Sequence, residues 1–267
     1  MLQRTLISLA LLALAALLLV FRETLFPIFI LLVGLCAQWE VYGAFRKGGY
    51  KPTIWTGMLF MACLYPVYTL WGLEGVLCIY LVLTTINLVW GVFMPQRQLK
   101  DTTASIFAMF YPGWCVLTMV IINAQPKQLA DIGMTLLILI PCSNDIFAFL
   151  FGRFLGKTPL APKISPKKTV EGALGGFGCG ILVSLAAGVV FRTLLGYTAM
   201  PLLHYALVGA LGGLFSQVGD LTASTLKRSM GIKDFSHVLG NHGGIMDRAD
   251  SIMLGSVALF VFYTVFY

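Results

Sequence analysis

Long apolar stretches follow one another along this chain, and each is about as long as the segment that an α-helix needs to cross a membrane. A helix crosses the ~30 Å hydrocarbon layer with about 20 apolar residues. Of the 267 residues, 58% are hydrophobic and only 11% are charged, whereas soluble domains carry about 25% charged residues. These features exclude a soluble globular protein and predict an all-α, polytopic integral membrane bundle. We expect about nine transmembrane helices, at residues 5–21, 24–41, 54–71, 75–94, 105–123, 131–152, 172–191, 200–220 and 251–267.

Basic residues predict the orientation of this bundle, because short loops rich in Lys and Arg stay in the cytoplasm. With the N-terminus inside, 15 of the 18 Lys and Arg residues fall in inside segments, and only Arg22, Lys127 and Arg192 fall outside. The first apolar stretch resembles a signal-peptide core, but it continues into Arg22 and Glu23 without a clear cleavage site, so we interpret it as a retained anchor. The sequence thus predicts an N-in, C-out, multi-pass protein of the cytoplasmic (inner) membrane. Topology and anionic lipid headgroups explain its net charge of +7, and nucleic acid is not expected as a partner.

The two halves of the chain differ in composition. Residues 1–125 are almost uniformly apolar, and we expect them to form membrane scaffold helices. Residues 126–267 add glycines, lysines and acids. Their inside loops, 153–171 and 221–250, are the only polar segments long enough to bind a ligand, and we therefore expect a catalytic membrane half here, with its site facing the cytoplasm.

Glycines recur four residues apart in the second half, at Gly172, Gly176 and Gly180 and again at Gly209 and Gly213. This spacing lets helix backbones approach closely in lipid. A phosphate-binding glycine loop is the alternative, but the GxxxxGK[ST] pattern is absent and these glycines lie inside apolar stretches. The six cysteines form no CxxC pair, so we expect them to act as small buried hydrophobic residues and not as zinc ligands or disulfides.

Two polar segments near the inside ends of helices are candidates for a ligand site. Asp145 lies about two turns inside a predicted helix, where an ionisable residue costs ~2.5 to 3.5 kcal/mol. It is either functional or a hydrogen-bonded structural residue beside Ser143 and Asn144. The segment KISPKKTVEG, residues 163–172, is expected to be a stiff loop, because its prolines oppose a helix. Its basic and hydroxyl side chains either anchor the loop at the inner surface or bind phosphate groups: Lys163, Ser165, Lys167, Lys168 and Thr169.

The last polar segment combines acids, bases and a glycine turn. If the helix over 200–220 continues beyond the membrane, Asp220, Ser224 and Lys227 or Arg228 lie on one face, although a salt-bridged helix end would give the same stripe. Farther on, Asp247 and Asp250 are placed at the start of a helix, where the dipole favours carboxylates. The segment between Arg228 and Asp247 contains Lys233, Asp234, His242, Gly243 and Gly244.

These side chains favour chemistry on phosphate groups. Carboxylates without paired Cys or His spacing suggest Mg²⁺, which takes one or two carboxylates plus substrate phosphates. Lysines and arginines for phosphates, together with a Gly-Gly turn, are typical of nucleotidyl or phosphoryl transfer. The HExxH and GxSxG patterns are absent, so a zinc hydrolase and a Ser-His-Asp hydrolase are not favoured.

Three consecutive groups of residues form a longer motif: Ser224-x-Leu226-Lys227-Arg228, then Lys233-Asp234-x-Ser236, then His242-Gly243-Gly244-Ile245-x-Asp247-Arg248-x-Asp250. Shorter groups precede it in order: Asn144-Asp145, Gly152-Arg153 with Gly156-Lys157, and the segment from Ser165 to Gly172. This arrangement resembles the phosphatidate cytidylyltransferase (CDP-diacylglycerol synthase) family. The resemblance is specific over residues 140–251 and only compositional before them.

The resemblance implies an integral membrane enzyme that joins CTP to phosphatidic acid in the bilayer, releasing pyrophosphate and CDP-diacylglycerol. It implies Mg²⁺, with a second cation left open, and it is compatible with a homodimer, for which the glycine-lined helices also argue. Asp220 and Asp247 would hold the metal, with Asp145 and Asp250 in support. The residues expected to act in catalysis are Asp220, Asp247, Lys227, Arg228 and His242. Those expected to bind substrate are Ser165, Lys167, Lys168, Ser224, Lys233 and Arg248.

Departures from the family pattern leave alternatives open. Ala249 stands where the family motif prefers a larger apolar residue or Thr, and His237 has no evident role. A CTP-dependent nucleotidyltransferase or kinase acting on another lipid or polyprenol phosphate therefore remains an alternative. A transporter that uses Asp145 as its ion site is a remote alternative. Transporters of this kind have broken helices in two matching halves of the chain, whereas the sequence indicates broken helices only in the second half.

Overall fold

The computed structural model describes residues 21–94, 96–240 and 243–267. Within these ranges the chain forms seven helices that are long and apolar enough to cross a membrane, which confirms a helical membrane protein. They are α2 (Arg22–Lys47), α3 (Ile54–Phe93), α4 (Leu99–Asn123), α5 (Lys127–Leu155), α6 (Val170–Thr193), α7 (Leu202–Ser229) and α8 (Met246–Phe266).

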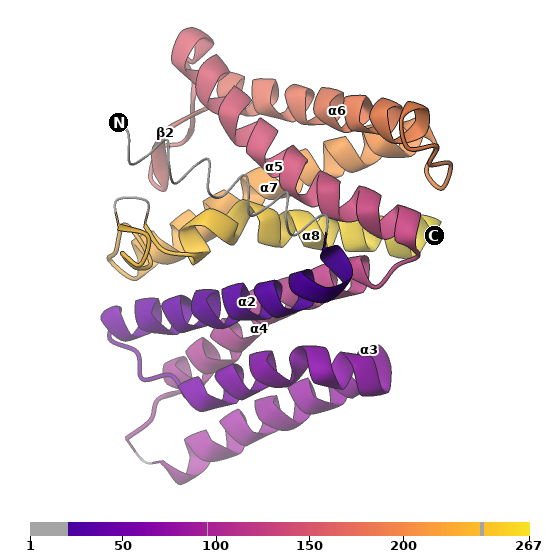
Figure 1. Cartoon of the computed structure of the whole chain (residues 1–267). Coiled ribbons are helices and arrows are strands. Elements are labelled where there is room, and N and C mark those ends of the chain that lie inside the picture. Colours follow the sequence, from indigo (N-terminus) through magenta and orange to yellow (C-terminus); the bar gives the residue numbers. More distant parts are fainter. Residues whose placement is uncertain (1–20, 95, 241–242) are drawn as a thin grey trace.

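Helix α3 is a hairpin of two helical arms. The chain reverses at Gly72, whose φ of 62° and ψ of −158° interrupt the helix, and Figure 1 shows the two arms lying side by side. Thr56 and Asn87 hydrogen bond across the arms, and the rings of Trp55 and Trp90 lie 6.4 Å apart. The arms correspond to the helices predicted at 54–71 and 75–94. The helix predicted at 5–21 lies outside the described residues, so the count of nine stays a prediction.

The segments over residues 46–51, 157–168 and 227–233 carry many of the basic residues, and they lie at one end of the bundle, on the left in Figure 1. There the Lys51 amide donates to Asp101 at 2.8 Å, Lys47 Nζ donates to the Phe235 carbonyl at 3.3 Å, and Arg228 Nε donates to the Ile164 carbonyl at 3.4 Å. We call this end of the bundle the basic end. The positive-inside rule predicts that it faces the cytoplasm.

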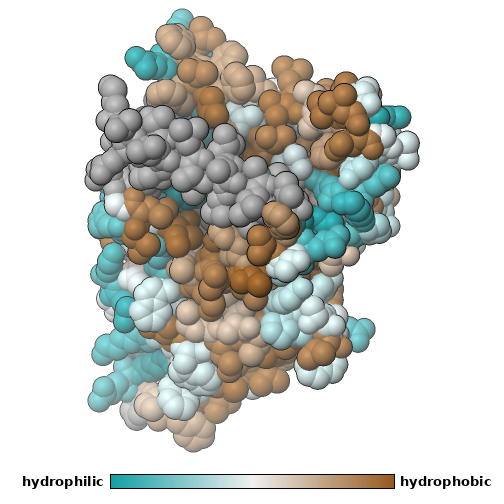
Figure 2. Space-filling model, in the orientation of Figure 1, coloured by the Kyte–Doolittle hydropathy of each residue, from teal (hydrophilic) through white to brown (hydrophobic). Residues whose placement is uncertain are grey.

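The opposite end holds two of the basic residues that were predicted to lie outside. Arg22 and Lys127 both pair with Asp131, at 2.9 and 3.1 Å. Figure 2 shows brown apolar side chains over most of the middle of the molecule and teal polar side chains toward its left and right ends. This distribution matches a bundle that crosses a hydrocarbon layer.

Both loops predicted at the basic end are shorter than expected. Within the loop predicted over 153–171, where 163–172 was expected to be a stiff loop, an antiparallel hairpin forms from β1 (Pro159–Ala161) and β2 (Ser165–Thr169). Proline opposes a helix but is tolerated in edge strands, and both strands of a hairpin are edges. The loop predicted over 221–250 is also too long, because α7 continues to Ser229 and α8 begins at Met246.

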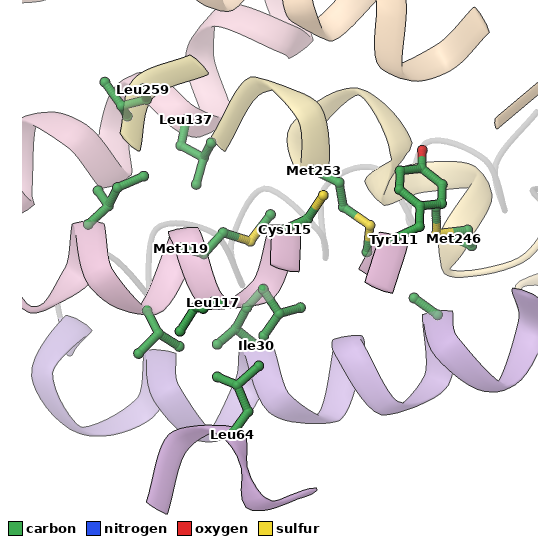
Figure 3. Close-up of a cluster of buried hydrophobic side chains, with 14 of the residues drawn as sticks. Ile30, Leu64, Tyr111, Cys115, Leu117, Met119, Leu137, Met246, Met253 and Leu259 are labelled. Carbon is green, nitrogen blue, oxygen red and sulfur yellow. The ribbon is translucent and has the colours of Figure 1, made fainter. Parts of the chain in front are cut away.

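Helix α4 packs in the centre of the molecule. Figure 3 shows Leu117 of α4 on the side of Ile30 of α2, while Met253 of α8 lies on the other side of α4. A buried hydrogen bond of 2.7 Å joins Thr118 of α4 to Ser256 of α8. The first and second halves of the chain therefore share one core.

The expectation for the cysteines is correct in part. All six are free thiols, but only Cys115 is buried among protein side chains, and Cys36, Cys78 and Cys142 are exposed on the outer surface of the helices. Helices in a membrane present apolar faces to lipid, so an apolar residue in such a helix need not be buried inside the bundle.

The glycine spacing in α6 and α7 serves contacts within the chain. A Cβ on Gly176 would lie 2.2 Å from Asn144 Oδ1 of α5, and a Cβ on Gly209 would lie 2.8 Å from the Ile181 Cα of α6. Close helix packing is thus confirmed. Because α5, α6 and α7 cover these faces themselves, the glycines no longer argue for a homodimer.

We expect Gly176→Ala to destabilise the protein by about 1 to 3 kcal/mol, because the added methyl group overlaps the Asn144 side chain and carbonyl. Gly178→Ala is the matched control in the same helix, since a Cβ there meets no atom within 4 Å among the described residues. Thermal unfolding in detergent measures both variants. Equal midpoints for the two would contradict the packing argument.

Candidate active site

A cavity of about 350 Å³ opens at the basic end, between α5, the β-hairpin, α6 and α7. Phe149 and Leu160 form part of an apolar wall. Charged and polar side chains from three elements meet in the same space: Asp145 and Arg153 of α5, Lys167 and Lys168 of β2, and Gln217 and Asp220 of α7. The structure therefore brings together two predicted metal ligands and two predicted phosphate ligands that lie up to 75 positions apart in the sequence.

An ion pair between Lys168 and Asp220 joins β2 to α7 inside this cavity. The lysine side chain is 30% exposed and the aspartate side chain 26%, so both remain accessible to a ligand. Asp220 also accepts a long hydrogen bond of 3.4 Å from Ser224 Oγ, one turn farther along α7. The stripe predicted for a continuing helix is thus present, and Ser224 is buried.

A polar network that the sequence analysis did not predict holds the cavity floor. Gln217 Nε2 donates to Asn144 Oδ1 and to the Ala173 carbonyl, both at 2.8 Å. Asn144 Nδ2 donates in turn to Ser216 Oγ at 2.7 Å and to the Gly213 carbonyl at 2.6 Å. These bonds tie α5, α6 and α7 together. The spacing of Gln217 and Asp220, three residues apart on one helix, was the available signal.

Asp247 and Lys227 form a second ion pair at the start of α8. Lys227 Nζ lies 2.6 Å from Asp247 Oδ1, and the two side chains are only 10% and 6% exposed. Asp247 Oδ2 also accepts the backbone amides of Phe235 and Gly244, both at 2.9 Å. Asp247 therefore organises the loop between α7 and α8, and Lys227 is its counter-ion.

Asp250 lies within electrostatic range of both ion pairs, Lys168–Asp220 and Lys227–Asp247. It is 6% exposed, accepts hydrogen bonds from its neighbour Ser251, and lies within electrostatic range of Asp145, Asp220 and Lys227. The structure records ion pairs for Asp220 and Asp247 but, among the described residues, none for Asp145 or Asp250. Within the described ranges, no three His, Cys, Asp or Glu side chains lie close enough to hold a metal ion by themselves.

The other predicted site residues that the structure describes do not line the cavity. Ser165 pairs with Ala161 in the hairpin, and the exposed Arg228 donates to carbonyls of Ile164 and Ile232. Lys233 and His237 are exposed, Arg248 lies within electrostatic range of Asp145, and His242 lies outside the described residues. Ala249 packs against the core, and nothing in the structure gives it a further role.

A helical membrane bundle with carboxylates and lysines around one cavity defines a membrane protein with a site suited to phosphate groups. The profile of the Cytidylyltransferase family matches residues 2–266, and the chain belongs to this family.

Three relatives are named phosphatidate cytidylyltransferase. The one from Aquifex aeolicus (strain VF5) is 35% identical over 184 residues, which cover 68% of this chain and 65% of that protein. The one from Mycobacterium bovis (strain ATCC BAA-935 / AF2122/97) is 30% identical over 264 residues, or 92% of this chain and 82% of that protein. The one from Staphylococcus aureus (strain COL) is 42% identical over 112 residues, or 41% of this chain and 40% of that protein.

Proposed function

We propose that this protein transfers the cytidylyl group of CTP to phosphatidic acid, giving CDP-diacylglycerol and pyrophosphate. The observation that carries the proposal is the cavity at the basic end, where Lys167 and Lys168 meet Asp145 and Asp220. Membership of the Cytidylyltransferase family and the names of the relatives support the same reaction. The apolar wall formed by Phe149 and Leu160 suits a substrate that arrives from the bilayer.

The cations of the cavity are placed to bind phosphate groups. Arg153 lies in the last turn of α5, and Lys167 and Lys168 lie on β2, so three positive charges face the same space. Lys168 can exchange Asp220 for a phosphate oxygen, because both side chains of that pair are partly exposed. Charge-assisted hydrogen bonds of this kind are about twice as strong as neutral ones.

The acids of the site fit a divalent cation. Asp145, Asp220 and Asp250 lie within electrostatic range of one another, and the buried Asp250 has no ion-pair partner among the described residues. Mg²⁺ is held by one or two carboxylates together with substrate phosphates, so a complete protein cage is not required. We propose Asp220 as its principal ligand, with a second carboxylate from Asp145 or Asp250. Asp247 joins them only where Lys227 releases its Oδ1.

The reaction needs no protein nucleophile. An oxygen of the lipid phosphate attacks the α-phosphorus of CTP, and a new P–O bond forms. The bond from the α-phosphorus to the oxygen bridging it to the β-phosphorus breaks, and pyrophosphate leaves with that oxygen and its electron pair. A bound Mg²⁺ would neutralise phosphate charge. Lys167, Lys168 and Arg153 would stabilise the charge that develops on the phosphate oxygens, because they are already positioned around the cavity.

We expect Lys168→Gln to raise the KM for CTP by about tenfold, equivalent to ~1.4 kcal/mol, because one charge-assisted contact is lost. Lys163→Gln is the matched control, since Lys163 is exposed in the turn of the same hairpin and does not line the cavity. Steady-state kinetics with varied CTP measure both variants. An unchanged KM in the Lys168 variant would remove this lysine from the substrate site.

The function itself is tested with the purified full chain in detergent, Mg²⁺, CTP labelled at the α-phosphate, and a panel of acceptors. Phosphatidic acid is expected to yield labelled CDP-diacylglycerol together with pyrophosphate. A polyprenol phosphate or another lipid phosphate that reacts faster would identify a different acceptor. Labelled CDP together with an unlabelled phosphorylated lipid would indicate transfer of the γ-phosphate by a lipid kinase.

A further inference from the structure

The loop between α7 and α8 is held by a carboxylate from the opposite half of the chain. Glu40, on α2, is only 5% exposed. Its Oε1 accepts hydrogen bonds from Ser236 Oγ at 2.6 Å and from the Ile245 amide at 3.0 Å. Its Oε2 accepts a hydrogen bond from the Met246 amide at 2.7 Å. Both oxygens are therefore used: two of the donors are the amides at the start of α8, and the third, Ser236, lies earlier in the loop between α7 and α8.

These contacts satisfy what the start of α8 requires. The first amides of a helix have no partner within the helix, and its N-terminus favours negative charge. Side chains of α8 offer no N-terminal cap, since the residue at that position is Ile245. The carboxylate of Glu40 therefore replaces a local cap, although it lies about 200 residues away in sequence.

The same contacts explain the second glycine of the Gly243-Gly244 turn. A Cβ on Gly244 would lie 2.4 Å from Glu40 Oε2, so only glycine leaves room for the carboxylate. Lys47, two turns farther along α2, donates to the Phe235 carbonyl at 3.3 Å. Helix α2 thus contacts this loop through Lys47 at Phe235 and through Glu40 at the start of α8, next to Asp247 and Asp250.

We propose that Glu40 is a positioning residue for the metal and phosphate site: it fixes the start of α8 and thereby the placement of Asp250 and of the Lys227–Asp247 pair. This inference rests on the proposed function. A carboxylate is required, because the amide of a glutamine would point an N–H group at one of the backbone donors.

We expect Glu40→Gln to lower kcat by about 10- to 100-fold and to raise the Mg²⁺ concentration for half-maximal activity, as displaced supporting groups do at metal sites. Hydrogen exchange of the 235–250 segment should become faster, while the rest of the chain stays protected. Glu40→Asp should restore part of the activity, because it keeps both acceptor oxygens. Glu74→Gln, an exposed glutamate in α3, is the control and should match the wild type.

The outcomes separate the two proposals. Wild-type kcat and Mg²⁺ dependence in Glu40→Gln, with an active parent enzyme, would overturn the role of Glu40 alone. A parent chain that transfers no cytidylyl group would overturn the function, and the Mg²⁺-induced rise in melting temperature together with exchange in 235–250 would still test Glu40. If Glu40→Gln does not fold, Glu40→Asp and Gly244→Ala take its place, and normal Mg²⁺ dependence in both contradicts the proposal.

Discussion

Asp220→Asn is expected to reduce kcat by on the order of 1,000-fold, which corresponds to ~4 kcal/mol of lost transition-state stabilisation. Asparagine keeps the size of the side chain but removes the charge that faces both Lys168 and the proposed cation. Because the Asp220 side chain is 26% exposed, the fold should survive the change. Cytidylyl transfer under saturating CTP and lipid measures the effect, with the melting temperature recorded on the same sample.

Glu23→Gln serves as the control for Asp220→Asn. The Glu23 side chain is 76% exposed and lies at the opposite end of the bundle from the cavity, so its loss of charge should leave the rate unchanged. An Asp220→Asn enzyme that keeps more than a tenth of the parent rate would exclude Asp220 as the principal metal ligand.

Lys227→Met is expected to destabilise the protein by about 3 to 5 kcal/mol, because it leaves the Asp247 carboxylate buried without its counter-ion. Activity should fall with stability, since the loop between α7 and α8 depends on Asp247. The double variant Lys227→Met with Asp247→Asn removes both charges and should recover a large part of the loss. Thermal midpoints of the parent, the two single variants and the double variant form the required cycle.

Lys233→Met is the matched control for Lys227→Met, because Lys233 is an exposed lysine in the loop that follows α7. Its free energy of unfolding should stay within about 0.5 kcal/mol of that of the parent, as expected for an exposed site. If Lys227→Met were as stable as this control, the pair with Asp247 would contribute nothing to the fold, and Lys227 would be free to bind phosphate as the sequence pattern first suggested.

Much of the fold is readable in the sequence because hydrocarbon thickness imposes a length on every spanning helix. That rule placed the arms of α3 and the body of each later helix correctly. It could not predict the hairpin of β1 and β2, since five residues rich in proline and lysine carry no alternating apolar pattern. The extension of α7 to Ser229 was predictable only as a condition, from the stripe of Asp220 and Ser224.

The candidate site was predictable in its residue types and less so in its pairings. Asp145, Asp220, Lys167 and Lys168 do meet in one cavity. A sequence shows charges but not their partners, so it could not reveal that Asp247 and Lys227 neutralise each other. Glu40 lies among apolar residues with no neighbouring motif, and only the packing of α2 near α8 brings it to the loop.

The hydrogen bonds between Glu40 of α2 and the start of α8 have a consequence for biosynthesis. Glu40 enters the membrane early in translation, while the amides it accepts belong to residues made about 200 positions later. Until they arrive, the carboxylate lacks these donors, and an unpaired polar group is costly to bury. The start of α8 is therefore fixed only after the final helix has been inserted, and a chain that ends before α8 lacks both the amides that Glu40 accepts and Asp250.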